Sequence, residues 1–144
     1  MRRDLESCKA ILEKENLTCV IRQGENVYKF TERGIKPFMG LIESGTDLQG
    51  AAAADKVIGK AAALLMQKAK IAAVYAAVIS EPACKVLKDA GIEVEFETLV
   101  ARIHNRKGDG LCPMESAVLT ITDADEAYRV LREKMQQMQH SRKL

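Results

Sequence analysis

The sequence has few aromatic residues and no tryptophan. Three Phe and three Tyr make up 4% of its 144 residues, so the core must be built mainly from Ala, Val, Ile and Leu. Proteins that bind single-stranded nucleic acid stack the bases on exposed aromatic rings, and this chain has little material for such a surface. Its net charge of +2 is spread along the chain. We therefore expect no nucleic-acid partner.

Long apolar runs and a cysteine framework are also absent. No run reaches the roughly 18 residues that a membrane-spanning helix needs, and Met1 leads directly into a charged segment, unlike a secretory signal peptide. The four cysteines, Cys8, Cys19, Cys84 and Cys112, include no Cys-x-x-Cys pair. We expect a cytoplasmic protein with reduced thiols and no membrane partner.

The composition predicts one ordinary globular domain. Apolar residues make up 47% and charged residues 29% of the chain, a balance typical of globular domains. A chain of this length buries a normal core in a single domain, and no linker or internal repeat divides it. We predict a single domain over residues 1–144, with frayed ends at 1–3 and 140–144.

Hydrophobic spacing in the first third predicts a helix, a hairpin and a second helix. Asp4–Glu15 carries apolar residues at helical spacing. Leu17–Arg22 and Val27–Phe30 read as two short strands joined by the turn sequence QGEN. Gly34–Glu43 again has helical spacing and is expected to form a short helix or a packed turn, and Gly45–Gly50 is expected to form a loop.

The middle of the chain carries the strongest signals. Asp55–Ala69, rich in Ala, Leu and Met, predicts a helix with Asp55 as its N-cap. Ile71–Ile79 is a nearly continuous apolar run of strand length, which is typical of a central strand covered on both faces. Ser80–Ala90 predicts a second helix with Ser80 as N-cap and a proline in its first turn.

The last third predicts one more strand and two helices. Ile92–Val100 alternates apolar residues with glutamates, as a half-exposed strand does. His104–Gly110 is a polar loop, and Cys112–Glu115 starts a short helix. Asp123–Gln139 predicts the final helix, with Asp123 as N-cap and a glutamate three residues later. This order predicts an α/β fold, a three-layer sandwich with a mixed central sheet.

Three motifs in this order, ADKVIGKAAALL, ISEPACKVLKDAGIEVE and GDGLCPMESAVL, give the chain a family resemblance. The succession of elements resembles the cytidine-deaminase-like fold. More narrowly, the chain resembles a small family of uncharacterised prokaryotic proteins, the domain of unknown function 1893 (DUF1893), from about Asp4 to Met135. The resemblance implies a cytidine-deaminase-like architecture and leaves the activity open.

Deaminases of that fold hold zinc with the motif H-x-E at one helix start and P-C-x-x-C at the next, and the glutamate moves the proton. Here the first predicted helix begins at Ala54–Val57, without His or Glu. At the second, Pro82 is followed by Ala83 and then Val86 where the cysteines would stand. Catalytic zinc needs about three protein ligands. We expect no metal site and no cofactor, and a divergent zinc deaminase is the least favoured function.

The polar residues at the predicted helix starts suggest a binding site instead. Lys56 and Lys60 are four residues apart and would share one helix face, while Gly59 leaves room for close approach. Helix N-termini attract anions, and Ser80 and Glu81 follow a strand end, where α/β proteins bind ligands. We predict a metal-free pocket for a small anionic or nucleotide-like metabolite. Its lining is predicted to comprise Asp55, Lys56, Lys60, Ser80, Glu81, Cys84 and Glu115.

Other interpretations of the same residues stay open. In one of them, Asp55 and Ser80 act only as helix caps, and the side chains of Lys56 and Lys60 are solvated. Cys84 and Cys112, each near a helix start, are candidate nucleophiles of a cysteine-dependent hydrolase or transferase, and the alternative for both is a buried, inert thiol. Glu115 is a candidate partner for one of the lysines. A third possibility is a structural or interaction protein that acts as a homo-oligomer.

Overall fold

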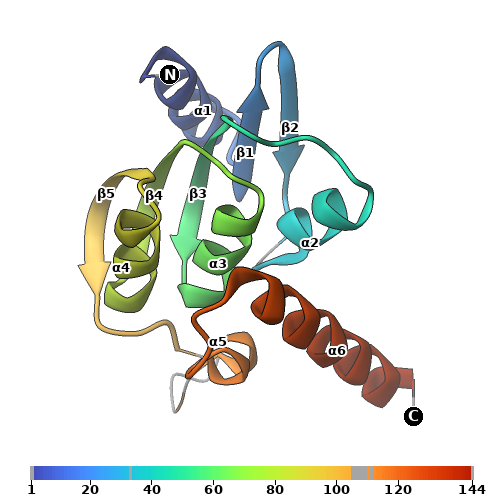
Figure 1. The fold of residues 1–144 in the computed structure, drawn as a ribbon. Helices are drawn as coiled ribbons and strands as arrows, with labels where there is room; N and C mark the ends of the chain where they lie inside the picture. Colours follow the sequence, from blue (N-terminus) through green and yellow to red (C-terminus); the bar gives the residue numbers. More distant parts are fainter. Residues whose placement is uncertain (1, 33, 105–109, 111, 144) are drawn as a thin grey trace.

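The chain folds around one five-stranded mixed sheet. In the computed structural model, residues 2–32, 34–104, 110 and 112–143 are described. The strands are β1 (Cys19–Gln23), β2 (Asn26–Phe30), β3 (Ala52–Ile58), β4 (Ala73–Ser80) and β5 (Glu93–Val100). They lie in the order β2-β1-β3-β4-β5 (Figure 1). β1 is antiparallel to β2 and β3, whereas β3, β4 and β5 are parallel.

Helices lie on both faces of the sheet, so the predicted three-layer α/β sandwich is confirmed. One face carries α1 (Arg2–Lys14). The other carries α2 (Lys36–Glu43), α3 (Lys60–Lys68), α4 (Glu81–Asp89) and the first part of α6 (Ala124–Lys143) (Figure 1). The short α5 (Pro113–Ala117) lies at the end of the sheet. α6 continues to Lys143, past the predicted end at Gln139.

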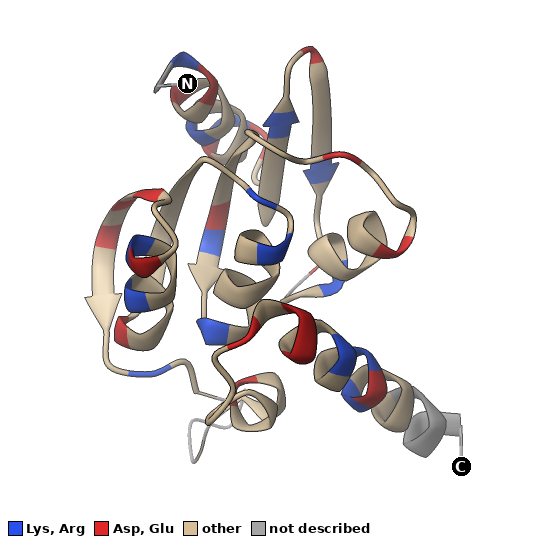
Figure 2. Cartoon of the chain, viewed as in Figure 1, with Lys and Arg blue, Asp and Glu red and all other residues tan. Residues whose placement is uncertain are grey.

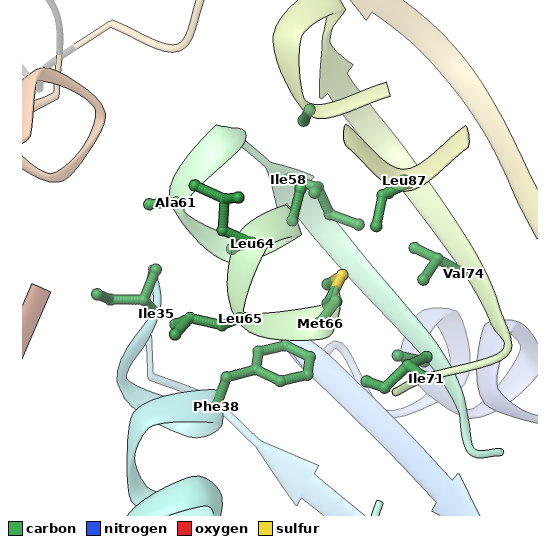
Figure 3. Close-up of a cluster of buried hydrophobic side chains, with 14 of the residues drawn as sticks. Ile35, Phe38, Ile58, Ala61, Leu64, Leu65, Met66, Ile71, Val74 and Leu87 are labelled. Carbon is green, nitrogen blue, oxygen red and sulfur yellow. The ribbon is translucent and has the colours of Figure 1, made fainter. Parts of the chain in front are cut away.

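Two apolar cores hold these layers together. The larger core lies between the sheet and α2, α3, α4 and α6, and includes Phe38, Leu64 and Leu87 (Figure 3). The smaller core lies between α1 and the sheet. There Leu5, Cys8 and Leu12 of α1 pack on strand residues, namely Val20, Ala52, Ala54, Ala73 and Tyr75. Within the described residues, no helix is long and apolar enough to span a bilayer.

One predicted element is wrong, and it is the one with the strongest sequence signal. Asp55–Ala69 is not a single helix: Ala52–Ile58 is the central strand β3, and α3 begins at Lys60. Asp55 is therefore not an N-cap. Alanine favours helices in isolation, but β3 lies between β1 and β4 with helices on both sides. Small side chains fit beneath both helix layers, and this packing outweighs helix propensity.

The other predicted elements are present, within a few residues of their predicted bounds. The hairpin register pairs Gln23 with Asn26. Ser80 caps α4 through a 3.2 Å hydrogen bond from Ala83 N to its Oγ. Asp123 caps α6 in the same way, since its carboxylate accepts a 2.8 Å bond from Glu126 N. Residues 105–109 of the predicted polar loop lie outside the described residues.

Candidate functional site

Two helices begin side by side at one edge of the sheet. β3 and β4 are adjacent and parallel, and each runs directly into a helix, β3 into α3 and β4 into α4. Both N-termini therefore lie at the carboxyl ends of the strands, the usual ligand-binding edge of α/β sheets. α5 lies at this same edge (Figure 1).

A carboxylate from α5 occupies the start of α3. Glu115 Oε1 accepts a 2.7 Å hydrogen bond from Lys60 N, and its Oε2 accepts a 2.8 Å bond from Ala61 N. The Glu115 residue is only 9% exposed. Two free N–H groups and the positive end of the helix dipole make such a position suitable for an anion. Here the protein supplies that anion from 55 residues away.

Gly59 is what allows the carboxylate to come so close. It is the N-cap of α3 and provides no side-chain cap of its own. A Cβ built on Gly59 would lie 2.6 Å from Glu115 Cδ, inside any tolerable contact. Its φ of −99° is accessible to every residue, so the requirement for glycine is steric rather than conformational. We call Gly59, Lys60, Ala61 and Glu115 the α3 anion site.

The predicted pocket includes Lys60 and Glu115, but it assigns the contact to side chains and omits Ala61, because the donors are backbone N–H groups. Gly59, which the sequence marks as a point of close approach, is the local signal for this site. Glycine is an accepted N-cap residue, and it stands directly before the apolar run of α3. The sequence predicts Glu115 as a partner of Lys56 or Lys60, and Glu115 does contact Lys60, but through the backbone.

A second contact joins the same two segments. Lys60 Nζ donates a 3.0 Å hydrogen bond to the carbonyl oxygen of Leu119, just after α5. The first turn of α3 therefore holds the α5 segment at two points, Glu115 and Leu119.

The start of α4 is satisfied locally. Ser80 is buried, and its hydroxyl is used in the cap on Ala83 N. Glu81 is exposed in the first turn of α4, where a negative charge is favourable for the helix dipole. Of these two residues, only Glu81 presents a polar side chain to solvent at this edge.

Asp55 is buried within the sheet rather than at a helix start. It is 6% exposed and lies in register with Cys19 on β1 and Ala76 on β4. Its Oδ1 accepts a 3.3 Å hydrogen bond from Val57 N. Burial raises the pKa of Asp55 to about 7, although hydrogen bonds from Val57 N–H and the Cys19 thiol oppose the rise. Burial and the neighbouring Asp55 together raise the pKa of Cys19 well above its usual value.

Lys56 lies on the other side of the sheet from the helix starts. It is exposed, and its Nζ donates a 3.0 Å hydrogen bond to Asn16 Oδ1, just after α1. The prediction that Lys56 and Lys60 share one helix face is therefore wrong, because Lys56 belongs to β3. The structure brings Lys60 and Glu115 together and leaves Asp55 and Lys56 apart from them.

Three of the four thiols are buried. Cys84 is 8% exposed and belongs to the larger core, whereas Cys8 and Cys19 are covered almost completely. Cys112 is partly exposed and forms the N-cap of α5, three residues before Glu115. The proposed catalytic roles of Cys84 and Cys112 stay predictions, and Cys112 is the more accessible of the two.

Comparison with known proteins gives the family. The family described as "TM1506: Domain of unknown function (DUF1893)" matches residues 7–135. The chain belongs to the DUF1893 family. No curated protein matches the chain. The crystal structure of a DUF1893 protein, TM1506 from Thermotoga maritima, is similar at 30% identity with a TM-score of 0.85. That match covers 93% of this chain and 91% of TM1506.

Two deaminases show a weaker likeness to this DUF1893 protein. The dCMP deaminase of cyanophage S-TIM5 is 12% identical, with a TM-score of 0.45 over 67% of this chain and 95% of its own. A bifunctional diaminohydroxyphosphoribosylaminopyrimidine deaminase/5-amino-6-(5-phosphoribosylamino)uracil reductase from Thermotoga maritima is 18% identical. Its TM-score is 0.41, over 67% of this chain and 34% of its own.

The zinc of deaminases does not fit the residues of this DUF1893 chain. The first helix of the pair starts at Gly59–Ala61, not at Ala54, and it too lacks His and Glu. At α4, Ala83 and Val86 stand where cysteine ligands would be needed. Across the described part of the chain, no three His, Cys, Asp or Glu side chains cluster closely enough to hold a metal ion.

The described surface also has two shallow depressions, both at the opposite end of the parallel strands. One of about 260 Å³ is lined by Gln67, Lys70 and Gly91, among others. Another of about 240 Å³ lies beside Thr46 and Lys68. Both are smaller than typical small-molecule pockets. Along α1, α4 and α6, basic residues alternate with acidic ones (Figure 2).

Proposed function

We propose that this protein binds a small anionic metabolite at the α3 anion site, in exchange for the carboxylate of Glu115. The observation that carries the proposal is the paired hydrogen bonding of that carboxylate to Lys60 N and Ala61 N. A carboxylate or phosphate group of a ligand can accept the same two bonds. Such an exchange leaves the number of hydrogen bonds to Lys60 N and Ala61 N unchanged. The affinity for the ligand therefore depends on its contacts with other residues.

The residues around the site supply those further contacts. Departure of Glu115 also loosens the contact of Lys60 Nζ with Leu119 O, and this frees the ammonium group for a phosphate. The exposed carboxylate of Glu81 at the neighbouring helix start is the proposed acceptor for hydroxyl or amino groups of a ligand. Asp55 and Lys56 are left out of the proposed site, because one is buried and the other lies across the sheet.

Thermal shift with defined anions tests the proposal. The probes are inorganic phosphate, AMP and a sugar phosphate, with adenosine as the uncharged control. Saturating ligand at about 100 times its dissociation constant stabilises the native state by ~2.7 kcal/mol, which corresponds to roughly 8 °C in a domain of this size. We expect the same anion to raise the melting temperature of the wild type modestly and that of Glu115→Ala more strongly, because the internal competitor is gone.

Gly59→Ala provides the matched control. Its Cβ would occupy the position of the bound carboxylate, so the double variant Glu115→Ala/Gly59→Ala should lose the anion response. If no anion stabilises the wild type or Glu115→Ala more than the double variant, the proposed site is wrong. A response in Glu115→Ala without any in the wild type would indicate repair of a helix cap and would also count against the function.

A cysteine-dependent hydrolase or transferase makes a different prediction. The favouring observation is that Cys112 is partly exposed and begins the helix that carries Glu115. This function predicts that one cysteine of the native protein reacts with a disulfide reagent much faster than a free small-molecule thiol reacts with the same reagent. Fast reaction lost in Cys112→Ser would support it, while labelling of Cys112 at an ordinary rate would exclude it.

A further inference from the structure

The outer edge of β2 has no neighbouring strand. β2 is the last strand at one side of the sheet, and within the described residues it pairs only with β1. The core beneath α1 includes residues of β1, β3 and β4 but none of β2, so α1 does not cover this side. The β1–β2 hairpin projects from the body of the molecule (Figure 1). An edge strand of this kind presents unpaired backbone groups to which another strand can bind.

Two residues of β2 direct their backbone polar groups outward. Phe30 O accepts a 2.9 Å hydrogen bond from Thr18 N, just before β1, so the backbone groups of Phe30 face β1. Along an antiparallel strand this direction alternates from one residue to the next. Tyr28 therefore also faces β1, whereas the N–H and C=O groups of Val27 and Lys29 point away from it. A second strand can exchange hydrogen bonds with these two residues.

A negative, an apolar and a positive side chain follow one another along this edge. Val27 is 37% exposed. It lies two residues after Glu25, in the turn before β2, and two residues before Lys29, and both charged residues are exposed. Lys29 pairs with Val20, which packs beneath α1, so Lys29 and Val27 point to the α1 side of the sheet. We call Glu25, Val27 and Lys29 the β2 edge.

We infer that the β2 edge pairs, in antiparallel orientation, with the β2 edge of a second copy of this chain, about a two-fold axis perpendicular to the sheet at Val27. The Val27 residues of the two copies exchange backbone hydrogen bonds, and their side chains pack together. Lys29 of each copy lies opposite Glu25 of the other, which gives two equivalent ion pairs. The sheets join edge to edge, so the helix layers stay on the two faces and none lies between the paired strands.

The order of charges favours a second copy as the partner, and it favours this register. Opposite charges at equal distances on either side of an axis are complementary to themselves, as an interface with two-fold symmetry requires. Pairing about Tyr28 instead would place each Lys29 opposite Val27 and leave Glu25 unmatched. The other edge strand, β5, carries three glutamates and no basic residue, so two copies of β5 would bring like charges together.

The existing contact of Lys29 leaves it able to form this pair. Its Nζ lies 3.0 Å from Glu15 Oε2, and the two side chains are 44% and 42% exposed. Exposed pairs of this kind contribute little to stability, and an ammonium group has three N–H donors. Lys29 can therefore bind Glu15 and the second copy's Glu25 together. The inference does not depend on the α3 anion site, because the β2 edge lies at the opposite, amino end of β3.

Sedimentation equilibrium of the full chain tests whether it self-associates through this edge. A short strand pair buries less surface than a stable dimer does, so we expect a weak dimer. The mass should rise above the 15.9 kDa of the monomer as the concentration increases through the high micromolar range. Val27→Pro removes an outward N–H that pairs with no other strand of the chain and should hold the mass at that of the monomer. A wild type that stays monomeric, or a Val27→Pro protein that associates equally, overturns the inference.

Disulfide trapping tests the register. In a Cys112→Ser background, which removes the partly exposed native thiol, Val27→Cys places two thiols across the axis. Their Cα atoms would be about 5.5 Å apart, a distance that a disulfide bridges. Thr31→Cys is the matched control, because it is exposed but its two copies would be roughly 25 Å apart. In a glutathione buffer, Val27→Cys should form about ten times more disulfide-linked dimer than Thr31→Cys, or more.

Charge reversal in the trapped protein tests the ion pairs. Glu25→Lys places two positive groups opposite each other and should lower the yield of the Val27→Cys dimer about fivefold, whereas Glu25→Gln should lower it less. Lys85→Glu on α4 is the control for a change of charge away from the edge and should leave the yield unchanged. Circular dichroism checks that every variant is folded. Equal trapping of Val27→Cys and Thr31→Cys, or a yield that Glu25→Lys does not lower, overturns the inference.

Discussion

The starts of α3 and α4 differ in where their caps come from. Both helices follow parallel neighbouring strands and begin at the same edge of the sheet. α4 is capped by Ser80, the residue just before it, whereas α3 is capped by Glu115, 55 residues further along the chain. A local cap forms with the helix itself, but a distant cap forms only when the α5 segment docks. The stability of the start of α3 therefore depends on the docking of α5. Any ligand that competes with Glu115 would weaken this contact between α5 and α3.

The strand leading into α3 should make folding pH-dependent between about pH 4 and pH 7, whereas the strand leading into α4 should not in that range, because the pKa of its one titratable group, Tyr75, is raised to about 12. Asp55 on β3 is buried with its pKa raised to about 7, and its register partner on β4 is Ala76. In the unfolded chain Asp55 ionises near pH 4, so between about pH 4 and pH 7 the folded state holds a proton that the unfolded state has lost. The contribution of Asp55 to stability is thus complete below pH 4 and is lost as pH rises to 7, by about 4 kcal/mol in total.

Asp55→Asn removes this titration. The difference in unfolding free energy between Asp55→Asn and the wild type should grow in favour of the variant by about 4 kcal/mol from pH 4 to pH 7, then level off. Urea unfolding at a series of pH values measures it, and other acidic groups cancel in the difference. A difference that is constant across this range would mean that Asp55 ionises at its ordinary pKa.

Gly59→Ala should destabilise the α3 end by about 3 kcal/mol. The new Cβ displaces the Glu115 carboxylate and leaves the N–H groups of Lys60 and Ala61 without acceptors at a cost of about 1–3 kcal/mol for such a loss. Gly40→Ala is the matched control, because a Cβ there meets nothing within 4 Å and the residue lies inside α2. It should stabilise by up to about 1 kcal/mol. Equal effects of the two variants in chemical unfolding would contradict the steric argument.

Glu115→Gln should cost about 2 kcal/mol, less than the glycine substitution. The amide keeps the shape of the carboxylate but offers one acceptor oxygen instead of two, and it loses the charge that favours a helix N-terminus. Amide hydrogen exchange locates the effect: protection should fall at Lys60 and Ala61 and stay unchanged at Ala83 on α4. Loss of protection at both helix starts would show that the two caps are not independent.

Prediction from the sequence succeeds at α4 and fails at α3 for the same physical reason. The signals of α4 are local: Ser80 as cap, Pro82 in the first turn and an apolar strand just before it. Those of α3 are not, because its cap residue Gly59 has no side chain and its carboxylate comes from another helix. An aspartate before an alanine-rich run imitates a helix start. Only the packing of both helix layers on Ala52–Ala54 makes this segment a strand.

Individual strands could likewise be predicted from neighbouring residues, whereas the contacts of the site join residues that are far apart in the sequence. The apolar run of Ile71–Ile79 is enough to predict β4, and the alternation in Ile92–Val100 is enough to predict β5. In both cases the pattern of apolar and polar residues along a short, continuous segment predicts the strand. No spacing rule relates Glu115 to Lys60, because a contact across 55 residues depends on the path of the chain between them. The predicted pairing of Glu115 with a lysine side chain is in fact a contact with the backbone N–H of Lys60.

Ser80→Ala should have the smallest effect, about 1 kcal/mol of stability. It removes one local hydrogen bond, from Ala83 N to Ser80 Oγ, and leaves the contacts of Glu115 intact. Because this cap is local, its loss should lower amide protection at Ala83 without changing the anion response of the α3 site. Ser80→Thr, which retains a capping hydroxyl, should recover part of the stability. If Ser80→Ala instead destabilised the protein as strongly as Gly59→Ala, the start of α4 would depend on tertiary contacts as much as the start of α3 does.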